Sequence, residues 1–360
     1  MKPASLESLR ERVREKDREL VQLLNERAAL ALDIGRIKHS EGIDIYDPAQ
    51  ERKVRDCILR FNQGPLPDDA LQAIFREVIA VSRRLQAPLS AAYFGPEASF
   101  THLAALSHFG EGSRLSPQPG ISEVFDEVER QKVLCGVVPI ENSLEGSVKQ
   151  TLDRLVVTPL TIRAEIFLRI AHHLLSVGGA LAGIRRIYSH PQALAQCRVW
   201  VRTNLPGAEL IESGSTAKAA QQALTDPEGA AIGSAQAGRV YGLKTAAEGI
   251  EDNPSNTTRF IVIGKGKAGE TTGRDKTSIL FGATHTPGAL YRALGMLAVE
   301  GINMSRIESH PAKTGPWQYL FFVDLEGHAA DERTARCLEA LKAHTTFTKV
   351  LGSYPRGDAP

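Results

Sequence analysis

The chain has 360 residues and a mass of 39.1 kDa, enough for two or three domains of ordinary size. Its 43 Lys and Arg against 42 Asp and Glu leave a net charge of +1, so the chain as a whole lacks the basic excess needed for non-specific binding to nucleic-acid phosphates. With 42% apolar and 24% charged residues, the composition is that of a folded globular protein, and no run of about 18 apolar residues offers a membrane span.

Cysteine usage and the first residues of the chain predict a cellular compartment. The four cysteines lie far apart without a CxxC pair, which argues against a disulfide framework and a zinc site (Cys57, Cys135, Cys197, Cys337). Residues 1–30 are dense in charge and lack the apolar stretch of a secretion signal. We therefore expect a cytoplasmic protein with no nucleic-acid and no membrane partner.

Composition divides the chain into three regions. Residues 1–87 hold 31 of the 85 charged residues but only 3 of the 31 glycines, a balance that predicts helices. Short apolar runs then alternate with Gly, Ser and Pro, which is typical of α/β structure, and a Gly-, Lys- and Thr-rich linker follows at 264–276. The predicted domains are residues 1–88, 89–264 and 277–354.

The N-terminal region predicts three helices. Leucine, valine and isoleucine recur at near-heptad spacing over residues 5–38, a helix about 50 Å long. Because so few residues cannot cover a helix of that length, we expect a homodimer formed through it. The second helix is predicted over residues 48–61, with Pro48 in its first turn, and the third over residues 68–86.

Basic residues of the first helix are spaced to share one ligand. Arg27 and Lys38 lie about 20° apart around the helix and about 16 Å apart along it, so their long side chains reach one small anion between them. Arg10 lies about 25 Å from Arg27 and would have to come from a partner chain. The alternative is that these are solvated charges on a coiled-coil-like helix.

A string of residues favours the first interpretation. Leu24-Asn25-Glu26-Arg27, Ile34-Gly35-Arg36-Ile37-Lys38 and Tyr46-Asp47-Pro48, with Leu9-Arg10, Asp17 and Glu51, closely resemble the all-helical chorismate mutase domain, an intertwined dimer. The resemblance implies that the partner's Arg10 and this chain's Arg27 bind the carboxylates of chorismate, and that Lys38 and Gln86 donate to its ether oxygen. It also implies that Asp47, Glu51 and Ser82 position the ring hydroxyl. Gln50 stands where that family usually has arginine.

Hydroxyl residues follow several predicted strands of the central region. They stand at five expected helix starts, at Ser99/Thr101, Ser143/Ser147, Ser189, Ser213/Ser215/Thr216 and Ser234. Each is explained by helix capping alone, because Ser and Thr are common N-caps. Together they indicate an anion-binding cleft at the strand ends of a doubly wound fold.

Four strings in this region resemble prephenate dehydratase. They are Gly95-Pro96-Glu97-Ala98-Ser99-Phe100-Thr101, the string from Pro139 to Val148, Tyr188-Ser189-His190-Pro191-Gln192-Ala193-Leu194, and Asn256-Thr257-Thr258-Arg259-Phe260. The resemblance implies two α/β lobes with the site between them, and Thr258 as the hydroxyl that protonates the departing group. It implies substrate contacts from Ser99, Thr101, Asn142, Ser143, Ser189, His190, Gln192, Arg259 and Phe260.

Some of these roles remain open from the residues alone. Arg259 is suited either to binding a carboxylate or to bracing the cleft, and His190 either to the site or to a structural hydrogen bond. The histidines lack metal-ligand spacing, and neither GxGxxG nor a P-loop is present, so we expect no metal and no cofactor.

The C-terminal region predicts a βαββαβ order over residues 277–283, 288–299, 303–310, 319–326, 331–344 and 346–351, which is ferredoxin-like. Thr286-Pro287-Gly288-Ala289-Leu290 and Ile307-Glu308-Ser309-His310-Pro311 resemble the ACT amino-acid-binding module. The resemblance implies a phenylalanine site at a dimer interface, formed by Gly288, Ala289, Leu290, Glu308 and Ser309. From spacing alone, Gly288 is explained as a turn glycine and Pro311 as an edge-strand proline. His310 stands where that family usually has arginine.

The three resemblances together predict an enzyme of the bifunctional chorismate mutase/prephenate dehydratase family. It would convert chorismate to prephenate and prephenate to phenylpyruvate under phenylalanine feedback. One alternative is an amino-acid-sensing binding protein without catalysis, which the presence of Thr258, Arg27 and Lys38 argues against. Another is an arogenate dehydratase, whose substrate carries an ammonium where prephenate has a keto group.

Overall fold

The computed structural model describes residues 5–87, 89–312 and 319–358, so residue 88, at the first predicted boundary, lies outside it. The chain divides into two compact units. One contains the N-terminal helices, through Leu89, together with Phe109–Arg114, and the other contains the remainder. Among the described helices, none is long and apolar enough to cross a membrane.

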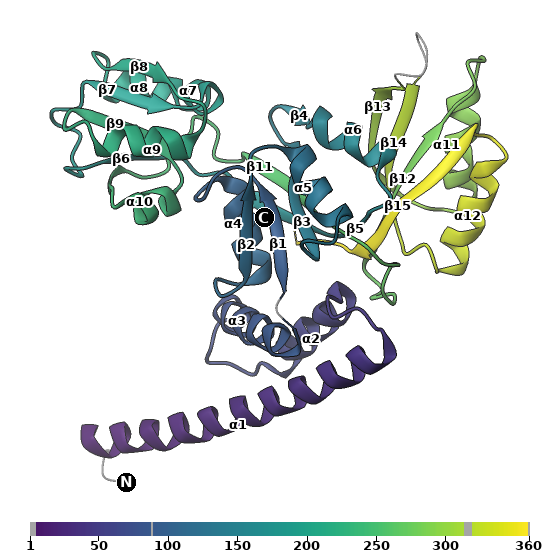
Figure 1. Ribbon diagram of the computed structural model, residues 1–360, viewed down its shortest axis with the longest axis horizontal. Helices are drawn as coiled ribbons and strands as arrows, with labels where there is room; N and C mark the ends of the chain where they lie inside the picture. The colour runs from purple at the N-terminus through teal and green to yellow at the C-terminus, as the bar shows by residue number, and fades with distance from the viewer. Residues whose placement is uncertain (1–4, 88, 313–318, 359–360) are drawn as a thin grey trace. The chain divides into compact units, whose positions relative to one another are not determined.

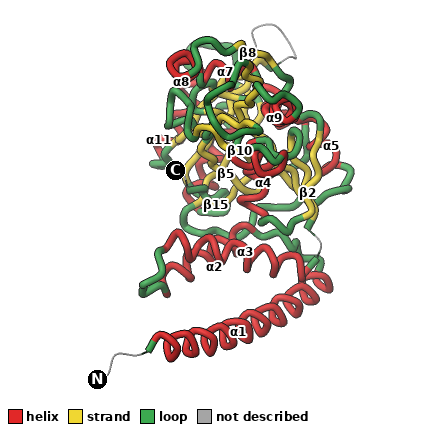
Figure 2. The backbone as a smooth tube through the Cα atoms, turned by 90° about the vertical axis from the view of Figure 1, so that its left-hand side faces the viewer, coloured by secondary structure: helices red, strands yellow, loops and turns green. Residues whose placement is uncertain are grey.

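The N-terminal unit is built from α1 (Leu6–Glu41), α2 (Pro48–Phe61) and α3 (Asp68–Gln86) (Figures 1 and 2). Ser5 caps the start of α1 by accepting from Ser8 N, and Gly42 ends it with a left-handed φ of 66°. This glycine closes the helix three residues later than predicted, whereas α2 and α3 have their predicted bounds.

Only the C-terminal part of α1 packs against α2 and α3. Ala31 and Gly35 are buried, but every residue from 5 to 26 is exposed. Several of these exposed residues are large and apolar (Leu6, Leu9, Val13, Leu20, Val21, Leu23, Leu24). Within this unit α1 therefore presents an uncovered apolar stripe, as its length and spacing predicted.

The second unit begins with a mixed sheet in the order β2-β1-β3-β11-β5, with the short β4 paired to β3. Its strands are β1 (Ser90–Phe94), β2 (Arg114–Gln118), β3 (Cys135–Asn142), β4 (Gly146–Ser147), β5 (Thr161–Arg169) and β11 (Thr257–Gly264). Its helices are α4 (Phe100–Phe109), α5 (Ile121–Glu129) and α6 (Lys149–Val157).

A second sheet follows in the order β10-β6-β9-β7-β8. It contains β6 (His173–Ser176), β7 (Arg186–Ser189), β8 (Glu209–Glu212), β9 (Gly229–Gly233) and β10 (Lys244–Ala247), with α7 (Pro191–Gln196), α8 (Arg198–Asn204), α9 (Thr216–Leu224) and α10 (Ala235–Tyr241). The chain leaves the first sheet after β5 and returns as β11, and Ile170 N donates to Asn256 O across the two crossings at 2.8 Å. Thr258 thus lies beside the crossing between the lobes.

The C-terminal module is a four-stranded antiparallel sheet in the order β13-β14-β12-β15, the ferredoxin-like arrangement. Its elements are β12 (Asp275–Gly282), α11 (Ala289–Val299), β13 (Met304–Pro311), β14 (Tyr319–Glu326), α12 (Glu332–Lys342) and β15 (Phe347–Pro355). The predicted fold classes of all three regions are confirmed. β12 begins two residues before the expected strand because Asp275 and Lys276 pair with Pro355 and Tyr354.

The C-terminal sheet shares a hydrophobic core with the first lobe. Leu280, Phe322, Leu351 and Tyr354 are buried in one cluster with side chains of β3, α5, α6 and β11. The C-terminal module and the lobe that carries β11 are therefore packed as one body within this unit.

Candidate active sites

Side chains from α1, α2 and α3 enclose a cavity of about 300 Å³ in the N-terminal unit. Six of the predicted mutase residues line it: Arg27, Lys38, Asp47, Glu51, Ser82 and Gln86. Leu30, Ala31, Ile34 and Ile79 supply apolar walls. The fold thus brings together cationic, amide and apolar groups from three helices around a volume suited to a small organic anion.

The cationic groups of this cavity are held by specific partners. Arg27 Nη1 donates to Ser82 Oγ, whose own hydroxyl donates to Val78 O at 2.7 Å. Burial lowers the pKa of the Arg27 guanidinium. Lys38 Nζ donates to Asp44 O and Ile45 O at 3.2 and 3.3 Å, which leaves the third N–H of the ammonium for a ligand.

Gln86 owes its place to the smallest residue of α1. A Cβ on Gly35 would lie 2.8 Å from Gln86 Cα, too close for any side chain. Gly35 therefore allows α3 to approach α1 closely enough for Gln86 to face Lys38 across the cavity.

Beside the acidic residues of the cavity lies an arginine, Arg83, that was not predicted from the sequence. Glu51 lies 3.2 Å from Arg83 Nε, and burial raises the pKa of the Glu51 carboxyl against the opposing effect of Arg83. Asp47 caps α2 by accepting from Gln50 N at 3.0 Å. Arg83 and Gln50 also line the cavity. The sequence did not indicate a site role for Arg83, because it directly follows Ser82 and neighbouring residues on a helix do not face the same way.

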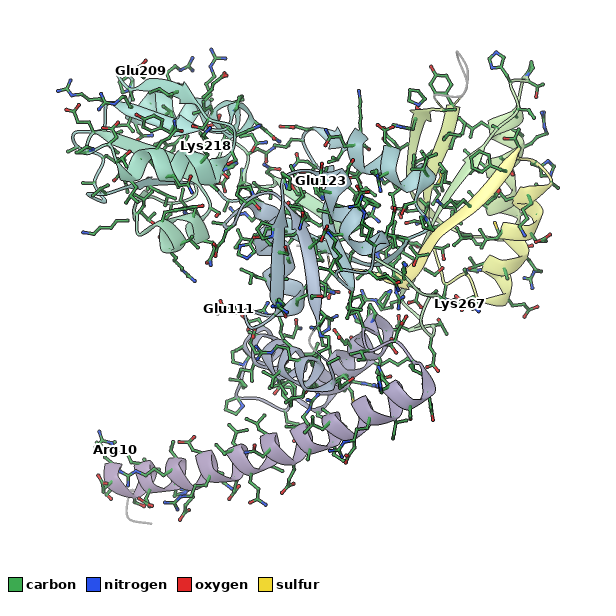
Figure 3. All side chains as sticks on the ribbon, in the orientation of Figure 1. Arg10, Glu111, Glu123, Glu209, Lys218 and Lys267 are labelled. Carbon is green, nitrogen blue, oxygen red and sulfur yellow. The ribbon has the colours of Figure 1, made fainter. Side chains whose placement is uncertain are left out.

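Arg10 does not reach this cavity. It lies near the N-terminal end of α1, 62% exposed, with Glu7 3.9 Å from its Nη1 (Figure 3). The rise of α1 separates it from Arg27 by about 25 Å, as expected from the sequence.

A second cavity, of about 480 Å³, lies between the two lobes of the second unit. Seven predicted dehydratase residues line it: Ser99, Thr101, Asn142, His190, Gln192, Thr258 and Phe260. The lining includes three of the hydroxyl residues expected at an anion-binding cleft (Ser147, Ser215, Thr216) and adds amides that were not predicted as contacts (Gln150, Gln196, Asn256). Among its described lining residues there is no Lys or Arg.

Thr258 belongs to a chain of amide hydrogen bonds in this cavity. Asn142 Nδ2 donates to Thr258 Oγ1 and to Asn256 Oδ1, both at 2.8 Å. Asn142 Oδ1 in turn accepts from Leu144 N and Glu145 N, at 3.0 and 3.2 Å, which fixes the orientation of the amide. Because the Thr258 oxygen accepts this bond, its own hydrogen is available to a ligand.

The chain of hydrogen bonds continues into the second lobe. Asn256 Nδ2 donates to Gln196 Oε1 at 3.0 Å, and His172 Nε2 lies 2.9 Å from the same oxygen. Burial lowers the pKa of His172, which favours the neutral ring. Gln196 has a sequence signal that was overlooked: it lies four residues after Gln192 and therefore on the same face of α7.

Three predicted substrate contacts lie outside the lining of this cavity. Ser189 is fully buried and donates to Ile232 O at 2.7 Å, and Ser143 Oγ accepts from Thr257 N at 3.0 Å. Arg259 points away from the cavity, with Nη1 donating to Asp324 and Nε 2.8 Å from Glu165 Oε2. Burial alone would lower the pKa of Arg259, but Tyr354, Asp324 and Glu165 hold that pKa above its usual value. The observed contacts are those of a brace between β11 and the C-terminal sheet.

The C-terminal module has its own cavity, of about 880 Å³. Gly288, Ala289 and Leu290 line it with Tyr319, Phe321 and Phe347, whereas Glu308 and Ser309 on β13 are not in its lining. His310 instead faces the first lobe, with Nε2 2.8 Å from Asp153 Oδ1.

Comparison with known proteins agrees with this division. The family model of chorismate mutase type II matches residues 9–87, that of prephenate dehydratase residues 91–268 and that of the ACT domain residues 277–343. The bifunctional chorismate mutase/prephenate dehydratase of Aquifex aeolicus (strain VF5) is 45% identical over 355 residues, 98% of each chain. The chain belongs to the bifunctional chorismate mutase/prephenate dehydratase family. The resemblance predicted from the sequence is confirmed.

Other relatives extend the comparison. The bifunctional chorismate mutase/prephenate dehydratase of Neisseria gonorrhoeae (strain ATCC 700825 / FA 1090) is 43% identical over 342 residues, 94% of each chain. The crystal structure of prephenate dehydratase from Arthrobacter aurescens in complex with L-Phe has 36% identity and a TM-score of 0.70, and the match covers 74% of this chain and 90% of that one. Neither alternative, a binding protein without catalysis or an arogenate dehydratase, is favoured by these relatives.

Proposed function

We propose that the chain rearranges chorismate to prephenate in the N-terminal cavity and converts prephenate to phenylpyruvate in the cavity between the lobes. The observation that carries the proposal is a convergence of distant residues. Side chains from three helices meet around the first cavity, and the amide of Asn142 presents the hydroxyl of Thr258 to the second. Both cavities supply fixed hydrogen-bond donors, and neither reaction requires a nucleophile.

In the first reaction, catalysis consists of conformational restriction and stabilisation of developing charge. The rearrangement breaks a C–O bond and forms a C–C bond within one molecule, and negative charge develops on the ether oxygen. Lys38 and Gln86, on facing helices, donate to that oxygen, while Arg27 binds a carboxylate. Glu51 and Asp47 then orient the ring hydroxyl from the opposite wall.

The second carboxylate of chorismate requires a cation from another chain. We propose that Arg10 of a second copy completes the cavity, in a homodimer held by the exposed apolar stripe of α1. α1 extends well beyond the part that packs against α2 and α3, and Arg10 lies on this exposed extension. This position supports the proposal, because a side chain there can reach the cavity of a second copy.

Hybrid dimers test this arrangement. Arg10→Ala and Lys38→Ala should each be nearly inactive alone, but mixing them after unfolding and refolding should restore up to about a quarter of the parent mutase activity. Half of all dimers in the mixture are then hybrids, and each hybrid has one of its two sites with both residues intact. Absence of recovery, in hybrids shown by mass spectrometry to have formed, would contradict a shared site.

In the second reaction, the ring hydroxyl leaves as water and the ring carboxylate as carbon dioxide. Thr258 donates its hydrogen to the departing oxygen, while the C–C bond to the carboxylate supplies the electron pair that makes the ring aromatic. The Asn142 amide makes this hydroxyl a better donor by bonding to its oxygen. A solvent proton then restores Thr258.

The carboxylates of prephenate are bound in this proposal by neutral donors. Ser99 precedes α4 and Ser215 caps α9, and both line the cavity with Thr101 and Thr216 in the first helical turns. Helix N-termini with hydroxyl side chains favour anions even where no cation is present. Ser143, Ser189 and Arg259 are then supports of the site and not contacts with the substrate.

We propose further that phenylalanine is the effector and that the C-terminal cavity binds it next to Gly288. Gly288 has a left-handed φ of 77°, and a Cβ there would lie 3.0 Å from Arg292 Nη1. Gly288→Val should therefore weaken phenylalanine binding at least about tenfold in calorimetry, since the side chain strains the turn and fills the approach to the backbone.

A matched glycine provides the control for that variant. Gly295→Ala lies in α11, with open space where its Cβ would be, and should bind phenylalanine as the parent does. If Gly288→Val and Gly295→Ala bind equally, the effector site lies elsewhere.

Chorismate turnover tests the two activities together. Loss of the ultraviolet absorbance of chorismate should be followed by the appearance of phenylpyruvate, with phenylalanine slowing the second step. Chorismate loss without phenylpyruvate would contradict the dehydratase proposal, and an unchanged chorismate signal would contradict the mutase proposal. We also propose the cytoplasm as the compartment, on the basis of four cysteines that form no disulfide within the described residues.

A further inference from the structure

One segment of the first lobe lies between the dehydratase cavity and the C-terminal module. This linking segment, residues 141–158, contains the end of β3, the strand β4 and the helix α6. Toward the cavity it presents Asn142, Gly146, Ser147, Val148 and Gln150. Away from the cavity it shares an apolar core with the C-terminal module and forms polar contacts with three of its side chains: Arg306, His310 and Lys349.

Arg306 bridges both strands of the β3–β4 hairpin. Its Nε lies 3.0 Å from Glu141 Oε2, and its Nη2 donates to Ser147 Oγ at 2.6 Å. Glu141 and Ser147 are paired across the hairpin, and the next pair is Asn142 with Gly146. The side chain of Arg306 is only 9% exposed, whereas that of Glu141 is 35% exposed, so the guanidinium is the buried partner of this pair.

Two further contacts attach the linking segment to the same module. His310, on β13 with Arg306, lies 2.8 Å from Asp153 in α6. Lys349 Nζ, on β15, donates to the carbonyls at the C-terminal end of α6, to Leu155 O at 3.0 Å and Thr158 O at 2.6 Å. Displacement of β13 relative to the lobe would therefore act on the hairpin and on α6 together.

β13 also leads to the cavity of the module. Ala312, directly after this strand, lines that cavity, six residues beyond Arg306. A ligand that changes the position of β13 there would shift the Arg306 guanidinium against the hairpin, one residue pair from the amide that holds Thr258.

We propose that Arg306 is the coupling residue between the C-terminal cavity and the dehydratase centre. It acts as a positioning residue, through Glu141 and Ser147 on Asn142. This proposal rests on the proposed function, since it concerns how the effector changes the dehydratase. Asn142 keeps its backbone and Asn256 bonds without Arg306, so basal turnover persists while control by the module is lost.

Kinetics of the full chain test the coupling. Arg306→Gln should retain phenylalanine binding and basal kcat within about threefold, but saturating phenylalanine should inhibit it at least about tenfold less than it inhibits the parent. Arg306→Lys keeps the charge beside Glu141 but not both contacts, and should be intermediate. Arg336→Gln, an exposed arginine of α12 that pairs with Glu300 and Glu332, is the matched control and should be inhibited like the parent. Unaltered inhibition in Arg306→Gln overturns the proposal.

Hydrogen exchange provides a readout that does not depend on activity. Peptides within residues 141–158 should exchange faster in Arg306→Gln than in Arg336→Gln, and phenylalanine should change their exchange in the parent but not in Arg306→Gln. Equal exchange in the two variants overturns the proposal even if the parent makes no phenylpyruvate. Absence of phenylpyruvate in the parent contradicts the proposed function separately, and phenylalanine binding by each variant in calorimetry shows that the unit carrying residue 306 has folded.

Discussion

Replacing Thr258 by alanine should lower phenylpyruvate formation by about 100- to 10,000-fold, the range expected for loss of a general acid. The hydroxyl is the group that the cavity presents with a free hydrogen, because its oxygen already accepts from Asn142 at 2.8 Å. Without it, hydroxide must leave unprotonated. Prephenate supplied directly, with phenylpyruvate absorbance as the readout, measures this step alone.

The adjacent threonine is the matched control for this variant. Thr257 is on the opposite face of β11 and is absent from the described lining of the cavity. Thr257→Ala should therefore keep most of the dehydratase activity, and Thr258→Ser, which keeps a hydroxyl, should retain part of it. Chorismate loss should be unchanged in all three. Equal dehydratase activity in Thr258→Ala and the parent would exclude Thr258 as the acid.

Replacing Lys38 by alanine should lower the rate of chorismate loss by about 100- to 1,000-fold, the cost of removing one donor to a developing oxyanion. Lys38 has two of its donors fixed by Asp44 O and Ile45 O, so the ammonium is held at the cavity before any ligand arrives. The loss should fall on kcat more than on KM, since Arg27 still binds the substrate carboxylate.

An exposed cation of the same unit gives the control for Lys38→Ala. Arg76, on α3, is 47% exposed and has Glu77 at 4.0 Å. Arg76→Ala should leave the mutase rate within about twofold, because a surface ion pair contributes little. Dehydratase activity on added prephenate should remain in both variants. A mutase rate in Lys38→Ala equal to that in Arg76→Ala would remove Lys38 from the mechanism.

The order and type of the secondary structures followed from local patterns. α2 and α3 have their predicted bounds because Pro48 fixes a first turn, and because apolar spacing defines the buried face of each helix. The pairing of strands in the α/β region could not be predicted from such local patterns. β11 joins the first sheet after 87 intervening residues, 170–256, which contain the second lobe, and no local pattern specifies such a distant partner.

The candidate sites were predictable where one short string carried several of their residues. Thr258 and Asn142 were predicted separately, but the hydrogen bond between them joins residues 116 positions apart. Arg83 and Asn256 were missed as site residues because nothing in a helix or loop pattern shows which way an amide or guanidinium points. Gln196 was missed although its spacing of four residues from Gln192 places both on one face of α7. Arg259, by contrast, was predicted as a substrate contact, but its side chain lies in a buried ion-pair cluster with Glu165 and Asp324.

The sequence by itself determined the three regions, the long first helix, and the residue types suited to binding small dianions, because composition, periodicity and short motifs are local properties. Tertiary structure alone decided which of those residues share a cavity. It placed Ser189 and Arg259 in supporting contacts and brought Arg306 of β13 against the hairpin that carries Asn142. The physical reason is that burial and hydrogen-bond partners depend on contacts between segments far apart in the chain, and only the folded packing specifies these.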